Sequence, residues 1–298
     1  MKKRAILLIV TAFIFSFTIF CSADSHGGLN MKQKPKVELG IDRLMSKHFH
    51  LIKGKKVGLI TNPTGVDSQL RATADLLAEH PDVELAALFG PEHGIRGGTF
   101  GSIEDSKDPK TGVPIYSLHG NIHKPTKEML EGVDALIFDI QDIGCRSYTY
   151  ISTMYRCMEA AGENKVNFIV LDRPNPVNGL IVDGNVLDPE FKSGIGIAEI
   201  AYMHGMTVGE LALYFNEECD ITCDLEVIKM KGWDRDMTWE DTGLVWVPTS
   251  PHIPEDDSPW YYPLTGIFGE TPLVNIGVGY PLPFKLVGAP WMDAEKTA

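Results

Sequence analysis

The sequence lacks the short motifs that mark the commonest nucleotide, metal and serine-hydrolase sites. It has no G-x-G-x-x-G turn after its first predicted strand, no P-loop, no H-E-x-x-H frame and no G-x-S-x-G elbow. Cysteine is also scarce, with 5 in 298 residues and no paired zinc-ligand spacing. We therefore expect no cofactor, no metal ligands and no serine nucleophile.

Positive charge is in short supply as well. The chain has 27 Lys and Arg residues against 40 Asp and Glu residues, which gives a formal net charge of -13 at pH 7. An electrostatic field of this sign repels polyanions. Binding to nucleic acid is therefore not expected.

Residues 1–23 have the pattern of a secretory signal peptide or of a lipoprotein signal. Lys2, Lys3 and Arg4 precede the apolar run "AILLIVTAFIFSFTIF", and Cys21 follows in a string that resembles a lipobox. At about 1.5 Å per residue, this run of sixteen residues is shorter than a hydrocarbon core of roughly 30 Å. We expect an exported protein, either periplasmic or anchored to the membrane through a lipidated Cys21.

Strand and helix patterns alternate after a polar linker at residues 24–36. The runs "ALIFDI" and "FIVLD" are apolar throughout, as expected for strands of a parallel sheet that is covered on both faces. The sequence therefore predicts an α/β fold with a Rossmann-like, doubly wound, mostly parallel sheet over residues 37–190. From about Asn178 the character of the sequence changes, and the segment at residues 233–289 is rich in Pro, Gly and Trp with little periodicity. Because a helix starts close to residue 298, we expect a C-terminal part to be missing.

Six strands and four longer helices are expected along the chain. The strands are predicted at residues 56–62, 83–90, 113–120, 134–142, 167–176 and 225–233. The helices are predicted at residues 68–80, 124–133, 147–165 and 206–218, and Thr207 with Glu210 forms a capping box at the start of the last one.

Polar side chains gather where the predicted strands end. Ligands of a doubly wound sheet bind beyond the carboxyl ends of its strands, so these side chains should share one rim. They are Asn62, Glu92, His93, His119, Asp139, Asp142, Asp172, Arg173 and Asn175.

Glu92 is the strongest candidate for acid catalysis at that rim. Carboxylates together with Arg, Asn, Tyr and Trp in loops suit a carbohydrate ligand, and a glycosidase needs a protonated carboxylic acid beside the leaving oxygen. Phe89 and Pro91 flank Glu92 and could desolvate its carboxyl group, which favours the protonated form. The alternative is an exposed turn in which Glu92 pairs with Arg96.

Several strings, in this order along the chain, resemble the exo-β-N-acetylmuramidases, a family formerly described as a domain of unknown function. They are "GLITNPTGVD", "LFGPEHGIRG", "GVPIYSLHG", "FDIQDIGCRSYTYISTM", "LDRPNPVNG", "HGMTVGELALYFNEE", "GWDRDMTW" and "WVPTSPHIP". The resemblance covers roughly residues 37–293, and it is specific because the strings occur together.

This resemblance implies a Rossmann-like N-terminal domain over residues 37–190 and a smaller, incomplete α+β C-terminal domain over residues 191–298, with the active site in the cleft at their interface. It also implies an exo-acting glycoside hydrolase that releases non-reducing terminal β-linked N-acetylmuramic acid from peptidoglycan fragments during cell-wall turnover. It implies that Glu92, in the family's E-H-G motif, is catalytic, and that Glu270 stands where relatives carry a second glutamate. Asp142 and Asp139 are further candidates for that second carboxylate. The candidate substrate-binding residues are Asn62, His93, Arg96, Asp142, Arg146, Tyr148, Arg173, Asn175, Asn178 and His252.

The string "GVGY" at residues 277–280 departs from the family pattern, in which many relatives have G-R-G-T. An arginine at this place could hold an anionic substrate, because a guanidinium binds a carboxylate bidentately. Another cation must then replace it. The candidates are Arg96, Arg146, Arg173 and Lys285.

Other interpretations stay open for several residues. Asp142 and Arg146 are four positions apart and could form an intrahelical pair, and the aromatic residues of the loops could pack a core instead of stacking on sugars. Asn175 and Asn178 could be turn residues. For the whole protein, the alternatives are a non-catalytic muropeptide-binding lipoprotein on the same fold and a metal-dependent hydrolase. The oligomeric state is left open.

Overall fold

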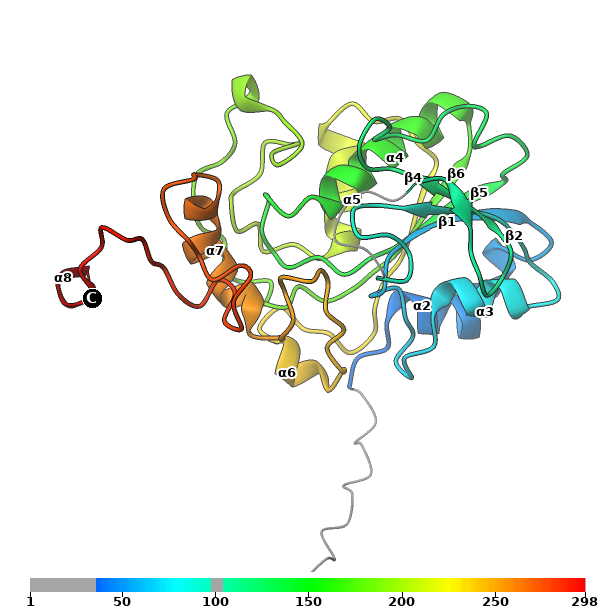
Figure 1. The fold of residues 1–298 in the computed structure, drawn as a ribbon. Helices are drawn as coiled ribbons and strands as arrows, with labels where there is room; N and C mark the ends of the chain where they lie inside the picture. The colour runs from blue at the N-terminus through cyan, green and yellow to red at the C-terminus, as the bar shows by residue number, and fades with distance from the viewer. Residues whose placement is uncertain (1–35, 98–103, 298) are drawn as a thin grey trace, which may run out of the picture. The chain divides into compact units, whose positions relative to one another are not determined.

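A seven-stranded sheet forms the centre of the fold (Figure 1). The computed structural model describes residues 36–97 and 104–297, which belong to one compact unit. The predicted signal segment, with Cys21, and the linker up to residue 35 lie outside the described residues. None of the helices in the described ranges has the length and hydropathy needed to cross a bilayer.

The strand order is β3-β4-β2-β1-β5-β6-β7, and every neighbouring pair is parallel except β3 with β4. This arrangement confirms the predicted doubly wound, mostly parallel sheet. The strands are β1 (Lys56–Thr61), β2 (Glu84–Gly90), β3 (Ser106–Lys107), β4 (Pro114–Ser117), β5 (Ala135–Asp139), β6 (Asn167–Leu171) and β7 (Leu225–Ile228).

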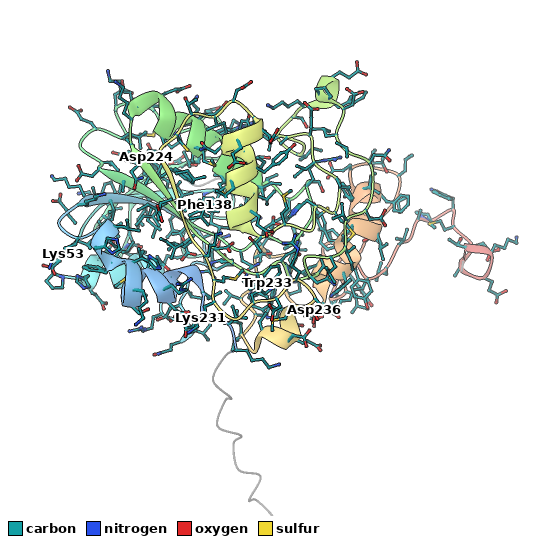
Figure 2. The ribbon with its side chains drawn as sticks, turned by 180° about the vertical axis from the view of Figure 1, so that it is seen from behind. Lys53, Phe138, Asp224, Lys231, Trp233 and Asp236 are labelled. Carbon is teal, nitrogen blue, oxygen red and sulfur yellow. The ribbon has the colours of Figure 1, made fainter. Side chains whose placement is uncertain are left out.

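The middle strands are apolar because both of their faces are covered. Successive side chains of β5 alternate between two core clusters: Leu136 and Phe138 belong to one, and Ala135 and Ile137 to the other. Figure 2 shows Phe138 in the interior of the molecule, whereas the labelled Lys53 lies at its edge. The uninterrupted apolar runs that the sequence showed are thus required by burial on both sides.

Helices from different parts of the chain cover the two faces (Figure 1). The cluster that contains Phe138 is covered by α4 (Tyr150–Asn164) and α5 (Val208–Glu218), and the opposite cluster by α2 (Gly40–Arg43) and α3 (Thr73–Glu79). The remaining helices are η1 (Leu44–His48), η2 (Phe49–Leu51), η3 (Pro189–Phe191), α6 (Trp239–Thr242), α7 (Ser258–Gly269) and α8 (Ala294–Thr297).

Helix α5 begins where the sequence predicted. The Glu210 amide donates to Thr207 Oγ1 at 3.2 Å, and the Thr207 amide donates to Glu210 Oε2 at 3.0 Å. Both bonds satisfy amides that would otherwise have no partner in the first helical turn. The predicted capping box is confirmed.

Two of the predicted helices are wrong in whole or in part. Residues 124–133 form turns, because Pro125 and Gly132 leave too few residues between them for a stable helix. The helix predicted at residues 68–80 begins only at Thr73. The residues before it form a turn in which the Asp67 carboxylate accepts hydrogen bonds from the amides of Gln69 and Arg71.

Strand β7 joins the central sheet, although the sequence placed it beyond the predicted boundary at residue 190. It pairs in parallel with β6, with Val170 opposite Val227. The sheet therefore extends past that boundary, and the division into residues 37–190 and 191–298 stays a prediction.

Candidate functional site

One cavity at the rim of the sheet brings together residues from distant parts of the sequence. It has a volume of about 350 Å³. Its walls come from the loop after β2, the start of α4, the loop at residues 250–253, and the segment from α7 to residue 284. The lining residues are Glu92, His93, Ser147, Tyr148, Thr149, Tyr150, Ile195, Ser250, His252, Ile253, Tyr262, Gly266, Gly269, Glu270, Ile276, Val278 and Phe284.

Five of the predicted site residues line this cavity, including both proposed catalytic carboxylates. They are Glu92, His93, Tyr148, His252 and Glu270. The cavity therefore juxtaposes two carboxylates and two imidazoles, which is a set of groups able to donate and accept protons.

Glu92 lies on a tight turn beyond β2. The Gly94 amide donates to the Pro91 carbonyl at 3.0 Å, and His93 adopts the left-handed backbone with φ 70°. This conformation is uncommon for a residue with a side chain, and such strain tends to occur at functional sites. The turn presents the Glu92 carboxylate to the cavity, with Oε1 3.9 Å from His119 Nε2.

Neither of the two environments considered for Glu92 from the sequence is found in full. Phe89 is fully buried in the core beneath the sheet, and the Glu92 side chain is 34% exposed, so Phe89 does not enclose it. Arg96 does not pair with Glu92 either. It donates to both oxygens of Asp108, at 3.0 and 2.8 Å, and to Asp75 at 2.8 Å.

Asn62 and two tyrosines attach the loop before His252 to the sheet. The Thr249 carbonyl accepts from Tyr150 Oη at 2.9 Å and from Asn62 Nδ2 at 3.4 Å, and Tyr148 Oη donates to Thr249 Oγ1 at 2.6 Å. Burial raises the pKa of both tyrosines, so their hydroxyls remain neutral donors. The predicted residue Asn62 thus lies beside the cavity as a structural anchor.

An edge-to-face series of aromatic rings forms one wall. Tyr148 meets Tyr150 at 5.0 Å between centroids and Tyr262 at 5.8 Å, and Tyr262 meets Phe284 at 4.9 Å. The hydroxyls of Tyr262 and Ser147 are 3.3 Å apart, and burial raises the pKa of Tyr262 to about 12. This wall offers apolar ring surface and neutral hydroxyls, which suits the C–H faces and hydroxyls of a sugar.

The side chains of Glu270 and His252 make no hydrogen bond or ion pair with the described part of the chain. Glu270 caps the C-terminal end of α7 and is exposed. His252 lies in a turn closed by the Ile253 amide, which donates to the Ser250 carbonyl at 3.1 Å. Both side chains are therefore available to a ligand.

Asp142 and Arg146 do not form the intrahelical pair considered from the sequence, since α4 begins only at Tyr150. Asp142 is buried, accepts from the Gly144 amide at 2.6 Å and lies 3.2 Å from His204 Nε2. Arg146 donates to the carbonyls of Asn185 and Ile200, at 2.8 and 2.5 Å. Neither side chain lines the cavity.

The Arg173 side chain forms hydrogen bonds with other residues of the protein. Its Nε donates to Asp139 Oδ1 at 2.6 Å, where both side chains are almost completely buried, and its Nη2 donates to the Val66 carbonyl at 2.8 Å. The other Asp139 oxygen accepts from Thr73 Oγ1 at 2.6 Å. Asp139 and Arg173 therefore form a structural pair outside the cavity lining.

Asn175 and Asn178 are placed as turn residues. Asn175 accepts from the Val177 amide at 3.1 Å, and Asn178, at φ 73°, accepts from the amides of Leu180 and Ile181 at 2.9 and 3.0 Å. Side-chain oxygens that bond to amides two residues ahead are the reason that Asn favours turns. These bonds leave neither oxygen directed to the cavity lining.

The sequence did not single out several residues of the site. Ser147, Thr249 and Phe284 were missed, although Ser147 and Thr249 lie inside strings already noted, "CRSYTY" and "PTSPHIP". Phe284 has a left-handed backbone with φ 63°, a conformation that no motif in the sequence indicates. Among residues 36–97 and 104–297, no three His, Cys, Asp or Glu side chains are grouped as metal ligands would be.

The fold is shared with two solved structures of DUF1343 family proteins from Bacteroides fragilis NCTC 9343. The first has a TM-score of 0.85 and 51% sequence identity, and the match covers 89% of this chain and 68% of that chain. The second has a TM-score of 0.75 and 38% identity, with 86% of this chain and 68% of that chain covered. The sheet and its rim thus define a protein of this structural class.

The sequence matches both the N-terminal and the C-terminal part of the family described as exo-β-N-acetylmuramidase NamZ. Residues 57–257 match the N-terminal part and residues 260–298 the C-terminal part. The peptidoglycan β-N-acetylmuramidase NamZ of Bacillus subtilis (strain 168) is 47% identical over 297 residues, which are 99% of this chain and 72% of that protein. The chain belongs to the exo-β-N-acetylmuramidase family.

Proposed function

We propose that this protein is an exo-acting glycoside hydrolase that releases non-reducing terminal β-linked N-acetylmuramic acid from peptidoglycan fragments. The observation that supports it most is the cavity in which Glu92 and Glu270 lie with an aromatic wall. Hydrolysis of a glycosidic bond by this class of enzyme uses two carboxyl groups. The name of the Bacillus subtilis relative, a peptidoglycan β-N-acetylmuramidase, agrees with this substrate.

In the proposed mechanism Glu92 is the general acid. Its carboxyl group protonates the glycosidic oxygen as the bond to the anomeric carbon breaks, and the positive charge that develops on the sugar ring is stabilised by the second carboxylate, Glu270. Glu270 acts as base, as nucleophile or as the group that orients the substrate's own acetamido oxygen. A carboxyl separation of about 5 Å would give retention, and one of roughly 6.5 to 9.5 Å would give inversion.

The proposal is tested with a chromogenic β-N-acetylmuramide. We expect Glu92→Gln to lower kcat by at least about 100-fold, because the amide cannot donate the proton that the leaving group needs. The matched control is Glu79→Gln at the exposed end of α3, which should retain full activity. Unchanged turnover by Glu92→Gln would remove Glu92 from the mechanism.

Two other functions are distinguished in the same assay. A muropeptide-binding protein without catalysis would bind the muramide and release no chromophore. A metal-dependent hydrolase would lose its activity in the presence of a chelator. We expect release of the chromophore by the wild-type protein and no effect of the chelator.

We also propose that the protein is exported and anchored to the membrane through Cys21. The signal pattern of residues 1–23 and the lipobox-like string support this proposal. Metabolic labelling with a fatty acid should mark the wild-type protein and leave Cys21→Ser unlabelled. Equal absence of label in both proteins, with the protein found in a soluble exported fraction, would favour a cleaved signal peptide.

A further inference from the structure

An anionic substrate needs a positively charged partner, and no described arginine or lysine side chain lines the cavity to supply one. Arg96, Arg146 and Arg173 are held by the contacts given above. Lys285, the fourth candidate, pairs with Glu255 and with Asp257, the latter at 2.8 Å.

The carboxylates that line the cavity increase the need for a positively charged group. Glu92 and Glu270 both contribute carboxylates, which would repel an anionic group of the substrate. His93 belongs to the Glu92 turn, and the His119 imidazole lies 3.9 Å from the Glu92 carboxylate. A cation for the substrate's anion is therefore better placed on a segment that neither carries nor contacts the acid.

His252 meets this requirement. It lines the cavity, it is half-buried, and its imidazole has no hydrogen-bond partner in the described part of the chain. The turn that carries it has Pro251 at its second position and is closed by the hydrogen bond from Ile253 to Ser250, a geometry that proline favours. Buried Ile253 and the Thr249 contacts fix this turn against the protein.

We propose that His252, as an imidazolium, binds the carboxylate of the substrate's lactyl ether and thereby selects muramic acid over uncharged amino sugars. This inference rests on the proposed hydrolase function and assigns the anion-binding group of that same site. A charge-assisted hydrogen bond from a pre-positioned imidazolium supplies the positive partner that the described lysines and arginines do not bring to the cavity.

The assignment makes substrate binding depend on pH. An imidazole binds an anion only while it is protonated, and it loses that proton as the pH rises, whereas the lactyl carboxylate stays ionised. KM for an acidic muramide should therefore rise with pH. Other titratable groups line the cavity, lie beside Glu92, follow His252 in the chain or pair with those residues, so the pH effect must be isolated by comparison; they are Glu92, His93, His119, Tyr148, Tyr150, Glu255, Asp256, Asp257, Tyr262, Glu270 and Lys285.

A pair of substrates provides that comparison. One is the chromogenic N-acetylmuramide with a free lactyl carboxylate, and the other is its carboxamide, which has nearly the same shape and no charge. Changes in the catalytic groups affect both substrates alike. We expect the ratio of the two KM values to change with pH in the wild-type protein, because only the acid is bound by the imidazolium.

Substitution of His252 should change the ratio of the KM values for the acid and the carboxamide. His252→Gln is expected to raise KM for the acid about tenfold with little change in kcat, and to leave KM for the carboxamide unchanged. His252→Lys should restore tight binding of the acid and remove the pH dependence of the ratio. The control is His50→Gln, at an exposed histidine of η2 outside the cavity.

The outcomes separate this inference from the proposed function. If the wild-type protein hydrolyses the muramides and His252→Gln raises both KM values equally, His252 does not bind the carboxylate. If the wild-type protein hydrolyses neither substrate, the hydrolase function fails. Calorimetric binding of free N-acetylmuramic acid and of its carboxamide to wild type and His252→Gln then still decides the role of His252.

Discussion

Glu270 is the C-cap residue of α7, where its negative charge opposes the helix dipole. Its backbone amide donates to the Phe268 carbonyl, but its side chain makes no hydrogen bond or ion pair with the described residues. The charge of Glu270 therefore does not stabilise the end of α7, and the side chain lines the cavity instead.

We therefore predict that Glu270→Gln lowers kcat for a muramide while leaving the melting temperature unchanged or slightly higher. The amide removes the unfavourable charge and retains the shape of the side chain. Steady-state kinetics and thermal unfolding of the same preparation measure both effects. A loss of stability that parallels the loss of activity would instead make Glu270 a structural residue.

The ion pair of Arg96 and Asp108 illustrates the opposite case, in which charged side chains stabilise the fold. Hydrogen bonds from Arg96 lower the pKa of the buried Asp108 to about 2. A carboxyl group with a lowered folded-state pKa contributes stability above its unfolded pKa of roughly 4, and that contribution is lost as the pH falls through 2.

Asp108→Asn should accordingly destabilise the protein by about 1–3 kcal/mol at pH 7, since Arg96 loses its charged acceptor. Denaturant unfolding at a series of pH values checks the sign. The difference between wild type and variant should shrink as the pH falls from about 4 towards 2. A difference that stays constant across this interval would contradict the assigned ion pair.

For single residues, the sequence predicted the types of side chain at the cavity better than it predicted which individual residues line it. Glu92, His93, Tyr148, His252 and Glu270 line one cavity. Other polar candidates, such as Arg173 and Asn178, satisfy partners inside the protein instead. Composition shows which side chains can hydrogen bond, but the partner that each one finds depends on the three-dimensional neighbours, which spacing along the chain does not specify.

Among the secondary-structure elements, helix α5 is stabilised by the hydrogen bonds of its first turn. Its capping box was predicted from the sequence because both of its bonds are local, between Thr207 and Glu210. Thr207→Ala removes the hydroxyl that accepts from the Glu210 amide, and we predict a loss of about 1 kcal/mol of folding free energy. Equilibrium unfolding measures it, and Thr207→Ser, which keeps the hydroxyl, should lose much less.

Strands were predicted more reliably than helices for a physical reason. β5 and β6 are buried on both faces, so most of their residues are apolar, and this pattern is visible in the sequence. The segment at residues 124–133 and the first residues of the predicted helix at 68–80 have helical composition. Pro125 and Gly132 leave too short a run for a helix in the first segment, and the turn around Asp67 competes with the helix in the second. Strand β7 joins the sheet through pairing with residues far away in the sequence, so its place in the sheet could not be predicted from the sequence.

On the scale of the whole molecule, the region from α7 onward carries an apolar surface. Leu264, Ile267, Phe268, Leu273 and Trp291 are each about half or more exposed. Figure 1 shows α7 and the segment that follows it away from the labelled strands of the sheet. Exposed apolar side chains in such numbers indicate a surface that associates with other apolar groups.

We predict that the protein binds a hydrophobic dye in its folded state. Leu264→Gln and Ile267→Gln together should reduce the dye fluorescence without lowering the melting temperature, since these side chains contribute little to the core. The control pair is Glu217→Gln and Glu218→Gln at the end of α5, which should leave the fluorescence unchanged. Dye binding that persists in the double Leu264 and Ile267 variant would place the apolar surface elsewhere.

The attachment of Thr249 has a consequence for when the protein becomes active. The bond from Asn62 to the Thr249 carbonyl joins residues 187 positions apart, and the bonds from Tyr148 and Tyr150 join residues about a hundred apart. During synthesis the first strands and the Glu92 turn leave the ribosome long before the loop that completes the cavity. A nascent chain therefore carries Glu92 before the cavity around it exists, and the cavity is complete only when the late segments have folded against the early ones.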